Sequence, residues 1–140
     1  MAEENGSIER LAVSISVHED FIVARASGDL DYQFAHLLHQ QVKAAWQAAP
    51  SAALVLDLSG VSFCDSIGVG VLVLLLNQSR EQQANLALSG IPARLERIMT
   101  LTGLRTAFQV APSVEEGIQT VVSAPRPPPV PESPDPADQP

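Results

Sequence analysis

The chain has 140 residues, a formal net charge of -8 and a composition that is 46% hydrophobic and 17% charged. This length fits one domain and excludes a large multidomain enzyme, and the apolar content supports a sizeable core rather than overall disorder. The 8 Lys and Arg residues are outnumbered by 16 Asp and Glu residues, so the chain lacks the basic surface that neutralises nucleic-acid phosphates. We therefore expect no direct nucleic-acid binding.

Cysteine usage and the apolar runs indicate a soluble, cytoplasmic protein. The single cysteine, Cys64, excludes an internal disulfide and a multi-cysteine zinc site. The N-terminus is acidic, unlike a signal peptide, and the longest apolar run, residues 67–76, has about half of the ~20 residues that a bilayer span requires. We expect no membrane association, no metal and no cofactor.

The two ends of the chain differ in composition from its middle. Residues 1–9 are expected to be flexible, and residues 124–140 carry most of the 11 prolines. Since proline lacks an amide donor and this segment has few apolar side chains, we expect a disordered, partly polyproline tail whose removal leaves folding intact. The tail could be a ligand for an SH3-like domain or only a solubilising segment. Residues 10–123 remain as the folded domain.

Hydrophobic periodicity predicts the first elements of this domain. Alternating apolar residues predict a strand over 11–17, and a turn at 18–20 leads into a second strand over 21–26. Apolar residues at three- and four-residue spacings then predict an amphipathic helix over 32–48, with Asp31 as its cap. The chain therefore begins with a hairpin followed by a helix.

Strands and helices then alternate to the end of the domain. The stretch over residues 66–83 suits a buried strand as well as a buried helix, and its length and polar end favour the helix. Ser113 and Glu116 have the spacing of a capping box at the start of the last helix. In order, the expected elements are a buried strand over 53–58, a helix over 66–83, a strand over 85–89, a helix over 92–102, a strand over 108–110 and a helix from 113.

The resulting order, ββαβαβαβα, predicts a single α/β domain with a mixed β-sheet and helices. Strands that alternate with helices pair in parallel, so only the initial hairpin is expected to be antiparallel. The functional loops should then lie at one end of the sheet.

The most informative stretch joins a buried strand through a short loop to a helix that begins at Asp65 and Ser66. The Ser66 hydroxyl is expected to be exposed at this helix N-terminus, where free backbone amides can hold a phosphate. Gly68 and Gly70 weaken the helix by roughly 1 kcal/mol each relative to alanine, which indicates that another backbone approaches closely. A capping role alone would also explain Asp65 and Ser66.

Other groups of chemically active residues give only weak evidence for a function. The sequence has no P-loop and no nucleophile elbow, so neither an NTPase nor a serine hydrolase is supported. His36 and His39 lie three residues apart on one helix face without an evident third metal ligand, and we expect them to be solvated. Arg94, Arg97 and Arg105 form a mild basic spot that could meet an acidic partner or simply be solvated.

Three segments together resemble the STAS domain family and, within it, the bacterial anti-sigma factor antagonists. They are GDLD at 28–31, LVLDLSGVSFCDSIGVG at 54–70 and LTGL at 101–104. The resemblance implies a STAS-like domain in which Ser66 is phosphorylated by a partner that is both an anti-sigma factor and a kinase. The family often has a second Ser or Thr at the next position, whereas this chain has Ile67, so we expect one phosphorylation site.

The resemblance also implies a mechanism without catalysis by this chain. The unphosphorylated protein would bind an ATP-dependent anti-sigma factor serine kinase and free the sigma factor, and phosphorylation at Ser66 would end that binding. A STAS module of a stress-signalling complex without direct sigma-factor control remains an alternative, as does a nucleotide-binding protein or enzyme that uses Asp65 and Ser66. The oligomeric state is not indicated. The expected partner-binding residues are Asp29, Asp31, Asp65, Ser66, Ile67 and Gly68, of which the first two could equally serve only a turn and a cap.

Overall fold

The computed structural model describes residues 10–129, which contain one mixed five-stranded sheet with helices on both faces. Strand order in the sheet follows the sequence, and only the pair β1–β2 is antiparallel. The predicted α/β class, the ββαβαβαβα order and the parallel pairings are confirmed. The strands are β1 (Leu11–Val17), β2 (Phe21–Leu30), β3 (Ala53–Cys64), β4 (Leu86–Ser89) and β5 (Gln109–Ala111).

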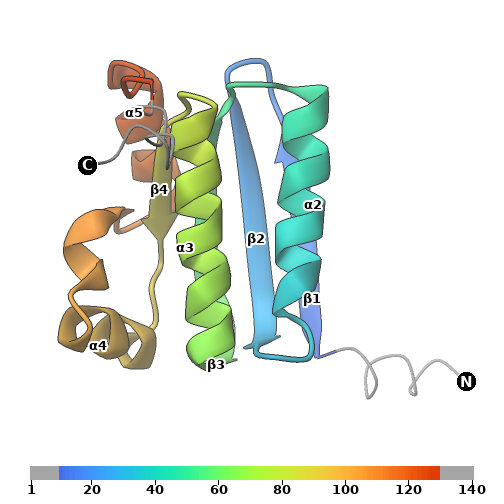
Figure 1. The fold of residues 1–140 in the computed structure, drawn as a ribbon, viewed down its shortest axis with the longest axis vertical. Helices are drawn as coiled ribbons and strands as arrows, with labels where there is room; N and C mark the ends of the chain where they lie inside the picture. The colour runs from blue at the N-terminus through green and yellow to red at the C-terminus, as the bar shows by residue number, and fades with distance from the viewer. Residues whose placement is uncertain (1–9, 130–140) are drawn as a thin grey trace, which may run out of the picture.

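Helices cover both faces of this sheet. Because crossovers between neighbouring parallel strands are right-handed, α2, α3 and α4 all pack on one face. Helix α5 follows the last strand and packs on the other face. Figure 1 shows α2 and α3 side by side in front of the strands. The ambiguous stretch after β3 is a helix, as predicted. The helices are α2 (Ala35–Ala48), α3 (Ser66–Glu81), α4 (Ala93–Leu101), the short 3-10 helix η1 (Leu104–Ala107) and α5 (Val114–Ser123).

Two strands are longer than the sequence predicted. The predictions ended them at residues 26 and 58, but β2 continues to Leu30 and β3 to Cys64, because the two strands keep pairing across two register shifts. Gly28 lies at one of these shifts with φ of 105°, a left-handed conformation that glycine adopts without strain. The GDLD segment is therefore mostly strand rather than turn.

The start of α2 also differs from the prediction. The helix begins at Ala35 rather than at residue 32, and its N-cap position has no side-chain cap. Asp31 Oδ1 instead accepts hydrogen bonds from the amides of Gln33 (3.1 Å) and Phe34 (3.2 Å). Asp31 therefore stabilises the turn that precedes the helix, and it does not cap the helix itself.

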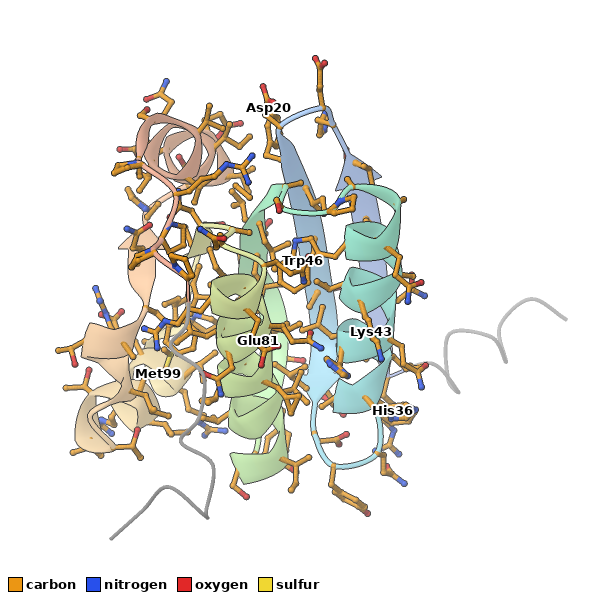
Figure 2. The ribbon with its side chains drawn as sticks, turned by 45° about the horizontal axis from the view of Figure 1, so that its top comes forward. Asp20, His36, Lys43, Trp46, Glu81 and Met99 are labelled. Atoms are coloured by element: carbon orange, nitrogen blue, oxygen red, sulfur yellow. The ribbon has the colours of Figure 1, made fainter. Side chains whose placement is uncertain are left out.

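The core has two layers, divided by the sheet. Leu54, Leu56 and Leu58 on β3 face the larger layer under α2, α3 and α4, whereas Val55 faces the smaller layer under α5. This alternation confirms that the strand is buried on both faces. On the inner side of α2, the indole N–H of Trp46 donates to the carbonyl of Ala52 (2.9 Å), which satisfies a polar group inside the apolar layer (Figure 2).

The first residues of the proline-rich segment contact the domain. Asn85 Nδ2 donates to the carbonyl of Pro125 (3.2 Å), and Gln83 Nε2 donates to the carbonyl of Pro127 (3.3 Å). These bonds attach the segment to the chain just before β4. Most of the expected disordered tail, and the expected flexible N-terminus, lie outside the described residues.

Truncation after Ala124 should lower the melting temperature by about 3–5 °C, because it removes the Pro127 carbonyl that accepts from Gln83 and the Arg126 side chain that donates to the Ser51 carbonyl, at a cost of about 1 kcal/mol. Asn85 keeps the carbonyls of Val121 and Ala124 as acceptors. Thermal unfolding followed by circular dichroism measures the change. Truncation after Pro129 is the matched control and should melt like the full chain. Identical melting of all three chains would show that the described contacts do not stabilise the domain.

Candidate functional site

The candidate site lies where the parallel strands end. Ser66 is the first residue of α3, immediately beyond the carboxyl end of β3, and its side chain is exposed. The carboxyl ends of parallel strands are the usual place for functional loops in open α/β sheets. The predicted exposure of a serine at a helix N-terminus is therefore present in the structure.

Asp65 connects two separate parts of the chain at this end. It is the N-cap of α3, and its Oδ1 accepts a hydrogen bond from the amide of Gly68 (2.9 Å). Its Oδ2 accepts a second bond from the amide of Tyr32 (2.9 Å), in the loop between β2 and α2. The carboxylate thus fixes the start of α3 against that loop.

The two glycines of α3 have different surroundings. A Cβ at Gly68 would lie 2.0 Å from the carbonyl oxygen of Leu30 and 2.8 Å from Cys64 Sγ, so only glycine fits there. The predicted close approach of another backbone is confirmed at this position, and that backbone belongs to β2 of the same chain. A Cβ at Gly70 would meet open space, so packing among the described residues does not explain this glycine.

The structure brings the expected partner-binding residues to one end but exposes few of them. Ser66 and Ile67 are exposed, the latter by 53%. Asp65 is half-buried and Gly68 is buried. The remaining two flank Leu30 at the end of β2, where Asp29 is half-buried and Asp31 is only 6% exposed. Ser66 and Ile67 are therefore the most exposed of the six, whereas the carboxylates of Asp31 and Asp65 hold the neighbouring backbone.

Two large side chains near this end and a third in the middle of α3 are exposed and were not predicted as site residues. Tyr32 is 70% exposed and is placed beside Asp65 by its amide hydrogen bond, and Phe63 is 43% exposed at the end of β3. Leu74, 46% exposed, lies two helical turns after Ile67, with the bare Gly70 between them. The sequence did hold a signal for the exposure of Leu74. Helix α3 has more apolar residues than one buried face requires, so some of them must lie at the surface.

The thiol of Cys64 lies directly behind the loop. Burial raises the pKa of this thiol from its ordinary value of 9.0 to about 11, and the neighbouring Asp65 carboxylate contributes to the same rise. Cys64 is therefore a protonated, buried group at neutral pH, as the sequence predicted for an apolar filler. The cavity that borders Cys64 and Phe63 holds only about 20 Å³, far less than the ~300 Å³ of a small-molecule pocket.

Among the other constellations considered from the sequence, Arg94 comes near this loop, because it lines the same small cavity as Phe63 and Cys64. On α2, His36 is exposed and His39 is half-buried, and residues 10–129 contain no group of three or more potential metal ligands. Arg94 and Arg97 are exposed on α4, and Arg105 Nε lies 3.6 Å from a carboxylate oxygen of Glu96. No helix in the described part of the chain has the length and apolar character of a membrane span.

Comparison with known proteins identifies relatives of the whole domain. The STAS domain family model matches residues 12–117. The Bacillus subtilis anti-sigma-B factor antagonist is 29% identical over 76% of this chain and 96% of its own length. The crystal structure of an anti-sigma factor antagonist from Mycobacterium paratuberculosis, 26% identical, superposes with a TM-score of 0.71 over 81% of this chain and 95% of the other. The phosphorylated Bacillus cell fate determinant SpoIIAA, 22% identical, shares the fold with a TM-score of 0.62 over 79% of this chain and 99% of that protein.

Alanine at Gly68 should destabilise the domain by several kcal/mol, because the new methyl group would overlap the Leu30 carbonyl. Alanine at Gly70, the matched control in the same helix, meets open space and should stabilise the domain by about 0.5–1 kcal/mol through higher helix propensity. Urea unfolding of both variants measures the difference. Similar free energies of unfolding for the two variants would refute the close contact at Gly68.

The raised pKa of Cys64 should make stability fall at alkaline pH. Below about pH 9 the thiol is protonated in both the folded and the unfolded state, so its contribution is fully present. As the pH rises from about 9 to about 11, the unfolded chain ionises first, and the free energy of unfolding drops by up to about 1.4 kcal/mol per pH unit. Urea unfolding of the wild type and of Cys64→Ala across this range isolates the effect, since a parallel loss in both proteins would assign it to other groups.

Proposed function

This chain belongs to the STAS domain family, and we propose that it is an anti-sigma factor antagonist switched by phosphorylation at Ser66. In its unphosphorylated form it binds an anti-sigma factor serine kinase and frees the sigma factor. After the kinase has transferred phosphate from ATP to Ser66, the complex dissociates. The observation that carries the proposal is an exposed serine hydroxyl at the first position of α3, in a chain whose relatives are named anti-sigma factor antagonists.

The backbone around Ser66 suits a phosphate. Asp65 satisfies the amide of Gly68, and the amide of Val69 bonds to the Asp65 carbonyl (3.0 Å). Within residues 10–129, no hydrogen bond engages the amides of Ser66 and Ile67. Free amides and the positive end of the helix dipole stabilise an anion at this position, so the domain would remain folded after modification.

The surface beside Ser66 suits a protein partner. Ile67 and Leu74 form an exposed apolar stripe along α3, and Gly70 between them lets another backbone approach the helix closely. Tyr32 and Phe63 extend the apolar area around the start of the helix. Exposed aromatic and aliphatic residues grouped around one polar switch residue are typical of a recognition surface.

A phosphate would oppose such a complex electrostatically. It adds about -1.5 to -2 charge next to the Asp65 carboxylate, on a chain that already carries -8. A partner that fits a neutral hydroxyl and an apolar stripe would then have to desolvate and accommodate this charge. The change is local, so affinity falls while the fold persists.

The contacts of Asp65 argue against the enzymatic alternative. Both of its carboxylate oxygens accept backbone hydrogen bonds, from Gly68 and Tyr32, and these bonds orient the carboxylate towards the loop backbone. A general base must reach the hydroxyl of Ser66, and within residues 10–129 no hydrogen bond joins the Asp65 carboxylate to that hydroxyl. The phosphoryl transfer is therefore assigned to the partner kinase, and the role of this chain is binding.

The experiment starts from capture of partners. Immobilised wild-type and Ser66→Asp proteins are incubated with extract of the native cells, and an ATP-dependent kinase retained only by the wild type is identified and purified. With this kinase and ATP, the wild type should gain one phosphate by intact mass, and Ser66→Ala should gain none. Ser62→Ala, which removes another exposed serine near the end of β3, is the matched control and should be phosphorylated normally.

Phosphorylation should weaken kinase binding by about 5- to 150-fold, or 1–3 kcal/mol, without changing the circular dichroism spectrum. Ser66→Asp should give a smaller loss, because a carboxylate has less charge and fewer acceptor oxygens than a phosphate. Phosphorylation of Ser66→Ala, or a sharp drop in melting temperature on modification, would contradict the proposed switch. Capture of signalling proteins without any anti-sigma factor would favour the stress-complex alternative, and substrate turnover lost in Ser66→Ala would favour an enzyme.

A further inference from the structure

The outer side of β1 is an open sheet edge. No other strand of residues 10–129 pairs with it, and its sequence, LAVSISV, has no charge and no proline. Charges, prolines and bulges are the features that normally protect an edge strand from pairing with another chain. The opposite edge of the sheet is β5, which has only three residues. The edge at β1 is therefore the long one, and it lacks the usual protection.

Two hydrogen bonds define which backbone groups of β1 point outward. The amide of His18 donates to the carbonyl of Phe21 (2.8 Å), and the amide of Asp29 donates to the carbonyl of Arg10 (2.6 Å). Because hydrogen-bonded pairs alternate along an antiparallel ladder, the even-numbered residues of β1 bond β2. The odd-numbered residues direct their N–H and C=O groups to the open edge. They are Leu11, Val13, Ile15 and Val17.

The side chains of β1 make this edge complementary to itself. Val13 and Ile15 pack against the core layer under α2, while Ser14 is exposed on the opposite face of the sheet. A second β1, antiparallel and related by a two-fold axis at Ser14, would place apolar residues opposite apolar residues and small residues opposite small ones. The pairs are Leu11 with Val17, Val13 with Ile15, Ala12 with Ser16, and Ser14 with itself.

We propose that β1 binds β1 of a second copy of this chain in this register, joining the two sheets into one. All the outward backbone groups of the strand then find partners, and the pairs of matching side chains stabilise the contact. Ser14 and its copy form a pair without backbone hydrogen bonds, whose Cα atoms lie about 4.5 Å apart.

The charges at the ends of β1 fit the same arrangement. Arg10 precedes the strand, and His18, Glu19 and Asp20 follow it in the hairpin turn. Figure 2 places Asp20 at the tip of this hairpin, at the end of the molecule away from His36 near the start of α2. In an antiparallel pair, each Arg10 lies beside the acidic turn of the other copy, so opposite charges meet at both ends.

The geometry of the β1 pair restricts the assembly to a dimer and leaves the surface around Ser66 uncovered. An isologous contact uses the same edge of both copies and closes at a dimer. Because the two sheets run in opposite directions, the two Ser66 loops lie at opposite ends of the joined sheet. The dimer is independent of the proposed function, since neither its formation nor its test involves phosphorylation or the kinase.

The test introduces single cysteines into the full chain in a Cys64→Ala background. Under mild oxidation Ser14→Cys should form a disulfide-linked dimer, because two cysteines at the axis meet the Cα distance limit of about 7 Å. Ser16→Cys is the matched control on the same face, and its two copies would lie about 14 Å apart, since each residue advances about 3.4 Å. It should therefore form no disulfide-linked dimer. If Cys64→Ala lowers the melting temperature too far, the same two cysteines can be introduced into the wild-type sequence, because Cys64 is buried.

The second measurement uses no introduced cysteine: sedimentation equilibrium compares dimerisation of the wild type and of Ser14→Lys. Ser14→Lys places two ammonium groups together at the axis and should weaken dimerisation roughly tenfold or more, while the exposed position leaves the melting temperature nearly unchanged. Equal cross-linking of Ser14→Cys and Ser16→Cys would overturn the proposal, as would the absence of any disulfide-linked dimer. A dimer of unchanged affinity in Ser14→Lys would equally show that another surface joins the copies.

Discussion

The arrangement of the Ser66 end depends on the carboxylate of Asp65. One of its oxygens caps α3 through the amide of Gly68, and the other holds the amide of Tyr32 in the loop before α2. These bonds join segments that are far apart in the sequence, and the Leu30 carbonyl packs so closely on Gly68 that no side chain fits between them. The position of Ser66 is therefore set by neighbouring backbone and does not depend on its own side chain.

The predictable part of the fold was the part that local patterns determine. The alternation in residues 11–17 and the three- and four-residue spacing in α2 each report which side of an element is buried, so both elements were predicted, although α2 begins at Ala35 rather than at residue 32. The ends of β2 and β3 were not predictable in this way. Glycine and aspartate in GDLD are typical of a turn, but pairing with β3, which lies far along the chain, keeps this segment in the sheet.

The candidate site likewise has features that local sequence patterns predict and features that only the folded structure shows. Exposure of Ser66 follows from its place at a helix start after an aspartate cap, which is a local pattern. The surroundings of Gly68 depend on Leu30, and the position of Tyr32 depends on Asp65, so both required the folded structure. Glycine at both positions of α3 looked alike in sequence, yet Gly68 is fixed by packing inside the domain, whereas a Cβ at Gly70 would meet open space.

The groups that hold the loop are different from the group that would be modified, which explains how one modification could change binding without changing the fold. In the described residues, no hydrogen bond engages the Ser66 hydroxyl, and the bonds that hold the loop use Asp65 and backbone amides. Adding a phosphate to this hydroxyl would therefore break no existing contact. Its charge would act on whatever approaches Ile67 and the stripe beyond it, because those side chains share the exposed side of the helix. Because Asp65 holds the loop through two backbone amides, a phosphate at Ser66 would stay beside Ile67, where an approaching partner would meet its charge.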